Sequence, residues 1–196
     1  MDERLEIYET CIDYTLSWEQ IMRRLGSRFP IYQFYSERVN PDVFQIVGEG
    51  RKMVRIVIVN YSDLQTVFVR PAKIEELLMF VGQHPAAAEA VLYKSQEEGK
   101  NSQLIALGTP GLYWWQPMID VAPRYYVSIQ LFPYIWQSKS PDGSNTVRTM
   151  DAQSLEALEY QTNFGVKNGW KESRQFLAVL SDDVKCRFHR LSFWRR

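Results

Sequence analysis

The most hydrophobic run of the chain extends from Met53 to Asn60 and consists largely of valine and isoleucine. It is too short to cross a bilayer, and its β-branched residues favour a strand over a helix. Both odd and even positions are apolar from Ile56 to Val59. Because successive strand residues point to opposite faces, this pattern predicts a buried strand in a sheet that other elements cover on both sides.

Two helices are predicted before this strand. The first covers residues 3–14, where apolar residues recur at helical spacing: Leu5, Tyr8, Cys11 and Ile12. The second covers residues 18–25, because Ser17 stands three residues before Gln20 in the pattern of a capping box, and Gly26 follows as a helix end. The chain is therefore expected to begin with a helix pair.

Two further helices are predicted after the central strand. Pro71 precedes an apolar face that ends at Gly82 and is made of Ile74, Leu77, Leu78 and Val81. Pro85 begins an alanine-rich segment that runs to Glu98. Proline is common at the first position of a helix and glycine just after its last. We expect both helices to cover the sheet.

The remaining strands are predicted from alternation and from turn residues between the apolar segments. They cover residues 29–35, 42–47, 66–69, 103–107, 112–115 and 124–132. Residues 29–35 also fit a helix that begins at Pro30. The glycines at 48 and 50 predict that residues 42–60 form a hairpin. The expected fold class is α+β, or mixed α/β, with a largely antiparallel central sheet covered by helices.

The C-terminal part begins after a run of turn-forming residues at 138–147, which predicts a flexible loop. Residues 1–196 are expected to form one globular domain, in which this loop is a candidate boundary for a small subregion at 148–196. Within that subregion, residues 152–161 are predicted to be helical. Residues 176–180 form either a helix or the first half of a hairpin, and residues 184–189 alternate as a closing strand with a basic face.

Composition narrows the functional classes only slightly. The chain has 196 residues with 23 Lys and Arg and 23 Asp and Glu, so its net charge points to no polyanionic partner. Cys11 and Cys186 are distant from each other, which suits a reducing compartment. The first residues are acidic and lack the apolar core of a secretory signal, and no apolar run is long enough to span a membrane. We therefore expect a soluble cytoplasmic protein.

Two segments bear on nucleic-acid chemistry. Pro41 and Asp42 precede a turn and a hydrophobic strand, which resembles the opening of the metal-dependent nuclease pattern PD-(D/E)xK. The second half of that pattern is missing, because Asn60 stands where a carboxylate belongs and Asp63 has no lysine two residues on. The resemblance implies a degenerate nuclease. Asp42 would bind a divalent cation only if it keeps the metal-ligand role that the pattern gives this aspartate. The basic C-terminus offers a second way to bind nucleic acid.

The leading functional hypothesis is a non-enzymatic binding or scaffolding subunit of a protein assembly. Two groups of residues suggest the contact surface: the aromatic residues Trp114, Trp115, Tyr125, Tyr126 and Trp136, and the basic residues Arg187, Arg190, Arg195 and Arg196. Adjacent strand residues face opposite ways, so one tryptophan of the first pair is expected near a surface, where it would anchor a protein partner. The sequence predicts no cofactor and no metal site, because it lacks a glycine-rich phosphate loop and a Cys/His cluster.

Overall fold

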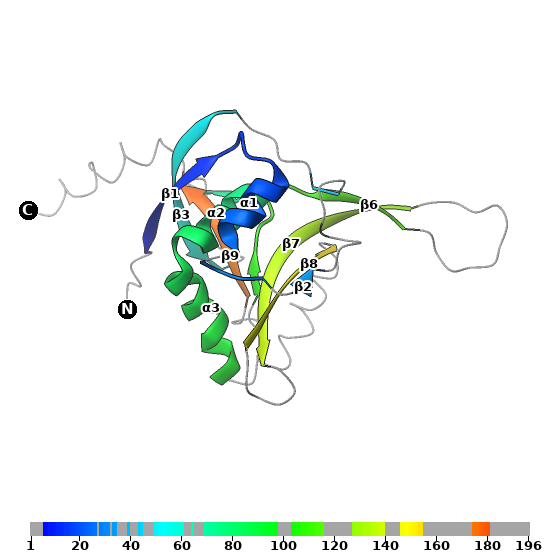
Figure 1. The fold of residues 1–196 in the computed structure, drawn as a ribbon. Coiled ribbons are helices and arrows are strands. Elements are labelled where there is room, and N and C mark those ends of the chain that lie inside the picture. Colours follow the sequence, from blue (N-terminus) through cyan, green and yellow to red (C-terminus); the bar gives the residue numbers. More distant parts are fainter. Residues whose placement is uncertain are drawn as a thin grey trace, which may run out of the picture.

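The computed structural model describes residues 6–26, 28–31, 33–34, 39, 43–44, 49–60, 64, 69–97, 103–115, 127–139, 146–154 and 174–180. These residues form an α+β fold in which the described strands join in one 9-stranded sheet. Three helices lie against that sheet (Figure 1). The fold class predicted from the sequence is confirmed, and the sheet is mostly antiparallel.

Along the chain, one strand and one helix are followed by three strands, two helices and five strands. The strands are β1 (Ile7–Asp13), β2 (Gln33–Phe34), β3 (Arg51–Val59), β4 (Val69–Pro71), β5 (Gln103–Ile105), β6 (Gly111–Trp115), β7 (Val127–Lys139), β8 (Thr146–Ser154) and β9 (Arg174–Leu180). The helices are α1 (Trp18–Leu25), α2 (Ile74–Gln83) and α3 (Pro85–Glu97). Along the sheet the order is β1-β3-β9-β5-β7-β8-β2, with β4 beside β9 and β6 beside β7.

Strand β3 is covered on both faces, as its sequence predicts. Ile56 belongs to a large apolar cluster that also contains residues of all three helices. Val57 and Val59 belong to a second cluster, whose other buried members lie on β5, β7 and β9 of the same sheet: Ile105, Phe132, Tyr134, Phe176 and Ala178. Since these residues alternate along one strand, each face of β3 meets its own core.

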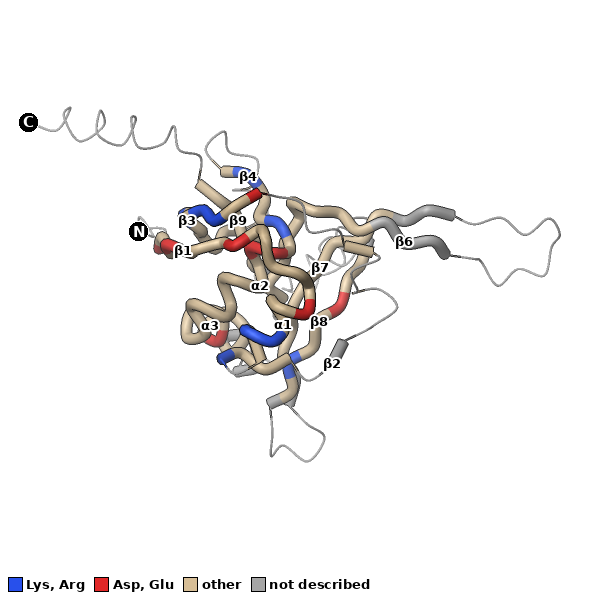
Figure 2. The backbone as a smooth tube through the Cα atoms, turned by 45° about the horizontal axis from the view of Figure 1, so that its top comes forward, with Lys and Arg blue, Asp and Glu red and all other residues tan. Residues whose placement is uncertain are grey.

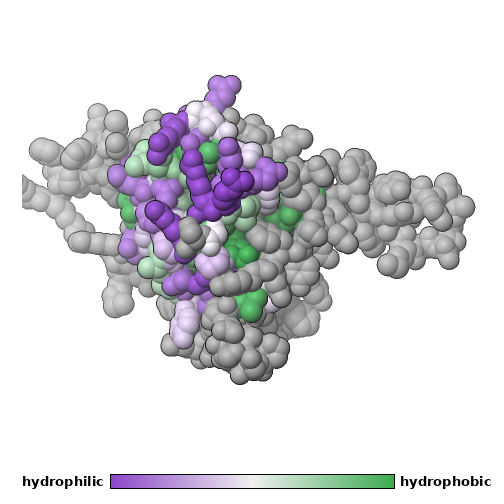
Figure 3. All heavy atoms as spheres, in the orientation of Figure 1, coloured by the Kyte–Doolittle hydropathy of each residue, from purple (hydrophilic) through white to green (hydrophobic). Residues whose placement is uncertain are grey.

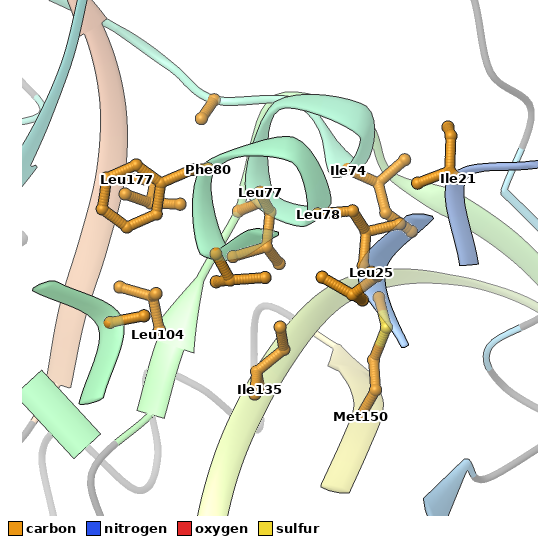
Figure 4. Packing of buried hydrophobic residues seen from close by; sticks show 14 of the residues in the cluster. Ile21, Leu25, Ile74, Leu77, Leu78, Phe80, Leu104, Ile135, Met150 and Leu177 are labelled. Atoms are coloured by element: carbon orange, nitrogen blue, oxygen red, sulfur yellow. The ribbon is translucent and has the colours of Figure 1, made fainter. Parts of the chain in front are cut away.

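The described helices pack on the first of these faces. Figure 4 shows Phe80 of α2 beside Leu177 of the sheet and Leu77 on the side of Leu104 and Ile135, while Leu78 lies next to Leu25 of α1. Phe80 is fully buried, and its ring makes an edge-to-face contact with Tyr8 at 5.3 Å between centroids. The helices predicted from Pro71 and Pro85 are thus confirmed as the cover of the sheet, although the first begins at Ile74 and Pro71 ends β4.

The predicted N-terminal helix pair is wrong in its first member. Residues Ile7–Asp13 form β1, which pairs antiparallel with β3 from Ile7 opposite Val57 to Asp13 opposite Arg51. Thr10 and Ile12 point into the core, and Ile7 and Glu9 are exposed. The apolar spacing fits a helix, the residue composition also fits a strand, and pairing with β3 decides for the strand. The second member is confirmed, with Ser17 and Gln20 forming the capping box of α1.

Other local predictions meet mixed outcomes. Residues 152–154 continue β8, so the helix predicted from 152 does not begin there, and residues 176–180 lie in β9. Val43 and Phe44 lie in a turn, and the described partners of β3 are β1 and β9. The rest of the predicted strand at 42–47, the remainder of the helix at 155–161 and the closing strand at 184–189 lie outside the described residues.

The sheet continues across the predicted loop at 138–147. Lys139 at the end of β7 pairs with Thr146 at the start of β8, and β9 pairs with β3 and β5. Strands from both sides of this loop therefore belong to the same sheet. The division of the chain into domains stays a prediction.

Candidate functional site

A pocket of about 520 Å³ opens where β1 and β3 meet α1 and α2. It is lined by Cys11, Asp13, Ile21, Arg24, Leu25, Arg28, Arg51, Leu78, Met79, Gly82 and Gln83. Figure 2 marks the basic positions on α1 and β3 in blue and the acidic positions on β1 in red. The lining thus combines charged side chains with an apolar wall, and we call it the arginine pocket.

Helix α1 brings two of the arginines to the pocket. Ser17 accepts a hydrogen bond from the Gln20 N–H, and the Gln20 side chain accepts one from the Ser17 N–H at 2.9 Å, so the start of the helix is capped. Arg24 lies in the last turn, and the Arg28 N–H donates to the Leu25 carbonyl just after it. Both arginine residues are exposed, and the buried residues of α1 pack the helix against α2.

The β1–β3 register brings in the third arginine. Arg51 pairs directly with Asp13, and its Nε donates to the Cys11 Sγ at 2.9 Å. Residues of like parity on paired strands share a face, so Cys11, Asp13 and Arg51 lie side by side. The side chain of Arg51 is exposed, and its guanidinium is held by its neighbours at the pocket rim.

Asp13 is held in its ionised form. Its carboxylate accepts hydrogen bonds from the Thr15 hydroxyl at 2.6 Å and from the Thr15 N–H at 3.2 Å. Arg24 lies 3.9 Å away. The Thr15 hydroxyl, with help from Arg24 and Arg51, lowers the pKa of Asp13 below its ordinary value against the opposing effect of desolvation. The pocket therefore contains one permanent negative charge beside three positive ones.

Helix α2 supplies the apolar wall. Leu78 is buried, and Met79 is partly buried against the large cluster. Gly82 lets the helices approach closely, because a Cβ at this position would lie 3.3 Å from the Leu25 Cδ1. Figure 3 shows hydrophilic side chains gathered on the face that carries α1 and the β1–β3 end, so the apolar wall lies among polar residues.

The last residue of α2 closes the outer edge of the sheet. Gln83 accepts a hydrogen bond from the Cys11 N–H at 3.0 Å and donates one to the Cys11 carbonyl at 2.8 Å. The ring Nε2 of His84 lies 3.1 Å from the Glu9 carbonyl. The Gln83 amide thus takes the place that a further strand would occupy beside β1. Such protection prevents an edge strand from pairing with another chain.

Replacing Gln83 with alanine is expected to lower the free energy of unfolding by about 2 kcal/mol, because two backbone groups of Cys11 lose their partners. The same change should speed hydrogen exchange at the Cys11 amide. Urea unfolding and amide exchange measure both effects. Gln130→Ala, on an exposed position of β7, is the matched control and should change neither. Unaltered exchange at Cys11 in the Gln83 variant would contradict the edge-closing role.

The structure places few of the aromatic and basic residues singled out in the sequence. Trp114 and Trp115 lie on β6, opposite Ser128 and Val127 of β7, and their side chains lie outside the described residues. Trp136 is partly buried and packs against the second apolar cluster. Tyr125, Tyr126, Arg187, Arg190, Arg195 and Arg196 lie outside the described residues, so their binding role stays a prediction.

The described residues add no support to the resemblance to the PD-(D/E)xK nuclease pattern. Asp42 and Asp63 lie outside them, and Asn60 is exposed and accepts a hydrogen bond from the Gln175 side chain at 3.2 Å. Within the ranges that the structure describes, no group of three or more His, Cys, Asp or Glu side chains is placed to hold a metal ion.

Sequence reasoning missed the arginine pocket. The adjacent arginines 23 and 24 of α1 are visible in the sequence as an exposed pair, but nothing local connects them with Arg51. That connection depends on β1 being a strand paired with β3, whereas the spacing of its apolar residues predicts a helix. Assigning β1 correctly as a strand would have placed Cys11 and Asp13 beside Arg51 and so revealed the site.

Comparison with known proteins gives no match, whether to family models, to curated proteins or to solved structures. In the part of the chain that the structure describes, no helix is both long and apolar enough to span a membrane. From its fold and its pocket, the molecule is an α+β protein with a cationic pocket at the β1 edge of its sheet.

Proposed function

We propose that the protein is a non-enzymatic binding protein and that the arginine pocket takes a ligand carrying an acidic group. The observation that supports this is the convergence of Arg24, Arg28 and Arg51 on one cavity of about 520 Å³. Arginine is the side chain best suited to hold carboxylate or phosphate, because its planar guanidinium donates several hydrogen bonds in fixed directions. Cavities of this size are typical of small-ligand sites.

The lining favours binding over catalysis. Its described titratable groups besides the arginines are Cys11 and Asp13. Asp13 accepts two hydrogen bonds from Thr15 and is kept ionised, which makes it a weak proton acceptor. The Cys11 sulfur is engaged by Arg51, and no histidine is among the described lining residues to serve as its base.

The proposal keeps the functional class inferred from the sequence and adds a second contact surface. A scaffolding role through the aromatic segment or the C-terminal arginines is a separate proposal that rests on sequence alone. The same holds for nucleic-acid binding through the C-terminal arginines or a degenerate nuclease site at Asp42.

The fluorescent probe 8-anilinonaphthalene-1-sulfonate tests the proposal, since it joins an anionic group to apolar rings. We expect one saturable site per chain and an affinity at least about tenfold weaker in Arg24→Gln and in Arg51→Gln, because each change removes a charge-assisted hydrogen bond. Fluorescence titration measures both. Far-ultraviolet circular dichroism and urea unfolding of each variant exclude loss of fold as the cause.

The matched control is Arg23→Gln, which removes an exposed arginine of the same helix that does not line the pocket. It should bind the probe as the wild type does. Absence of saturable binding would refute the proposal, and so would an equal loss in the Arg23 and Arg24 variants. The second result would mean that net charge, and not the pocket, attracts the probe.

A further inference from the structure

We infer that the acidic group of the ligand is a doubly charged phosphate monoester attached to a compact apolar body. This inference rests on the proposed binding function and specifies its ligand. Three features of the arginine pocket support it: the balance of charge, the different chain segments that carry the arginines, and the apolar residues of the lining.

The balance of charge favours a dianion. Arg24, Arg28 and Arg51 contribute three positive charges and Asp13 one negative charge, so the pocket has an excess of two positive charges. Asp13 keeps its charge, because Thr15 and the neighbouring arginines favour its ionised form. A monoanionic ligand would leave one positive charge without compensation, whereas a phosphate monoester above pH 7 carries close to two negative charges.

The approach of the arginines favours a tetrahedral group. Arg24 lies in the last turn of α1, Arg28 lies in the segment after it, and Arg51 comes from β3. A planar carboxylate is satisfied by a single bidentate arginine. A phosphate monoester presents three terminal oxygens in different directions, and this matches donors that come from different chain segments.

Arg24 and Arg51 have unequal freedom to reach a ligand. The Arg24 side chain is 59% exposed, and its contact with Asp13 is long at 3.9 Å. Arg51 is oriented by its 2.9 Å hydrogen bond to the Cys11 sulfur. We therefore assign Arg51 the fixed contact and Arg24 the contact that forms when the ligand enters.

The apolar part of the lining favours a ligand with an apolar body. Ile21, Leu25 and Leu78 are buried, and together with Met79 they are the apolar side chains of the lining. The polar Gln83 amide is occupied by the Cys11 backbone through two hydrogen bonds. Carbon and polar atoms share the accessible lining about equally, so an apolar body placed against the carbon adds affinity that inorganic phosphate lacks.

Calorimetric titration of the full chain at pH 8 with three probes tests the inference. Phenyl phosphate has the dianion and the apolar body, benzenesulfonate has the same shape with one charge, and inorganic phosphate lacks the body. We expect phenyl phosphate to bind about tenfold more tightly than either of the others. Arg51→Gln should remove most of this preference over benzenesulfonate, and Arg23→Gln should leave it unchanged.

Each alternative result has a distinct meaning. If benzenesulfonate binds as tightly as phenyl phosphate, the preference for a dianion is overturned while anion binding, and with it the proposed function, stands. If inorganic phosphate binds as tightly as phenyl phosphate, the apolar body is overturned. If none of the three probes and no anilinonaphthalene sulfonate binds, the proposed function fails together with the inference.

Discussion

Replacing Glu76 with alanine is expected to lower the free energy of unfolding by about 3 kcal/mol at pH 7, because the half-exposed Arg70, the Tyr14 hydroxyl and the Lys73 N–H all lose a buried acceptor. The carboxylate is fully buried at the start of α2. It accepts hydrogen bonds from both terminal nitrogens of Arg70 at 2.6 and 2.9 Å. The Tyr14 hydroxyl donates at 2.6 Å and the Lys73 N–H at 2.7 Å. One side chain thus joins β4, α2 and the segment after β1.

The effect should depend on pH in a direction that follows from the pKa of Glu76. Burial by itself would raise this pKa, but the hydrogen bonds from Arg70, Tyr14 and Lys73 outweigh it and lower the pKa below its ordinary value. A lowered pKa in the folded state stabilises the protein above the unfolded value of about 4.3. That contribution is lost as the pH falls through the folded pKa.

Urea unfolding of wild type and Glu76→Ala between pH 7 and pH 3 measures the prediction. The difference between the two proteins should be largest near pH 7 and should shrink toward pH 3. Glu89→Ala is the control, since Glu89 is half exposed in its ion pair with Arg148, and it should cost less than about 1 kcal/mol. A Glu76 effect that stays constant over this range would show that packing, and not charge, explains the loss.

Replacing Gly108 with alanine should be comparably damaging, at about 3 kcal/mol, because a Cβ has no room there. The added atom would lie 2.5 Å from the Pro71 carbonyl oxygen and 2.7 Å from that of Ala72. These are backbone atoms, which cannot turn away as a side chain does. The Gly108 N–H also donates to the Ala72 carbonyl at 2.7 Å, so relief of the clash would lengthen this hydrogen bond.

Thermal and urea unfolding of Gly108→Ala compared with Gly26→Ala checks this prediction. Gly26 has an ordinary helical φ of −57°, and the nearest atoms to an added Cβ lie at 3.5 and 3.8 Å. Alanine is therefore expected to be neutral or slightly stabilising at Gly26. Equal stability of the two variants would contradict the close approach of residue 108 to the end of β4.

Much of the fold is predictable because its determinants are local. Helix α1 follows from the capping box of Ser17 and Gln20, and α2 and α3 follow from apolar periodicity and punctuation by proline and glycine. The central strand β3 is predictable because both its odd and its even positions are apolar, which requires a core on each face. Each of these signals lies within a few residues of the structure that it predicts.

Strand β1 is an element whose structure the local sequence does not decide. Its residues fit a helical face by spacing and a strand by composition, so intrinsic preference is nearly balanced. Pairing of seven residues with β3, together with burial of Thr10 and Ile12 beneath α2, decides the outcome. These contacts join segments some 40 positions apart, and their free energy does not appear in any short window of sequence.

The candidate site divides in the same way. The sequence by itself determined that α1 ends in exposed arginines, that α2 has a continuous apolar face, and that β3 is buried. Only the tertiary structure decided that Arg51 lies beside Cys11, from which it is separated by 40 residues, and that Gln83 closes the β1 edge from 72 residues away. Pockets form between elements, so their residues converge through strand register and helix packing, and these depend on the whole core.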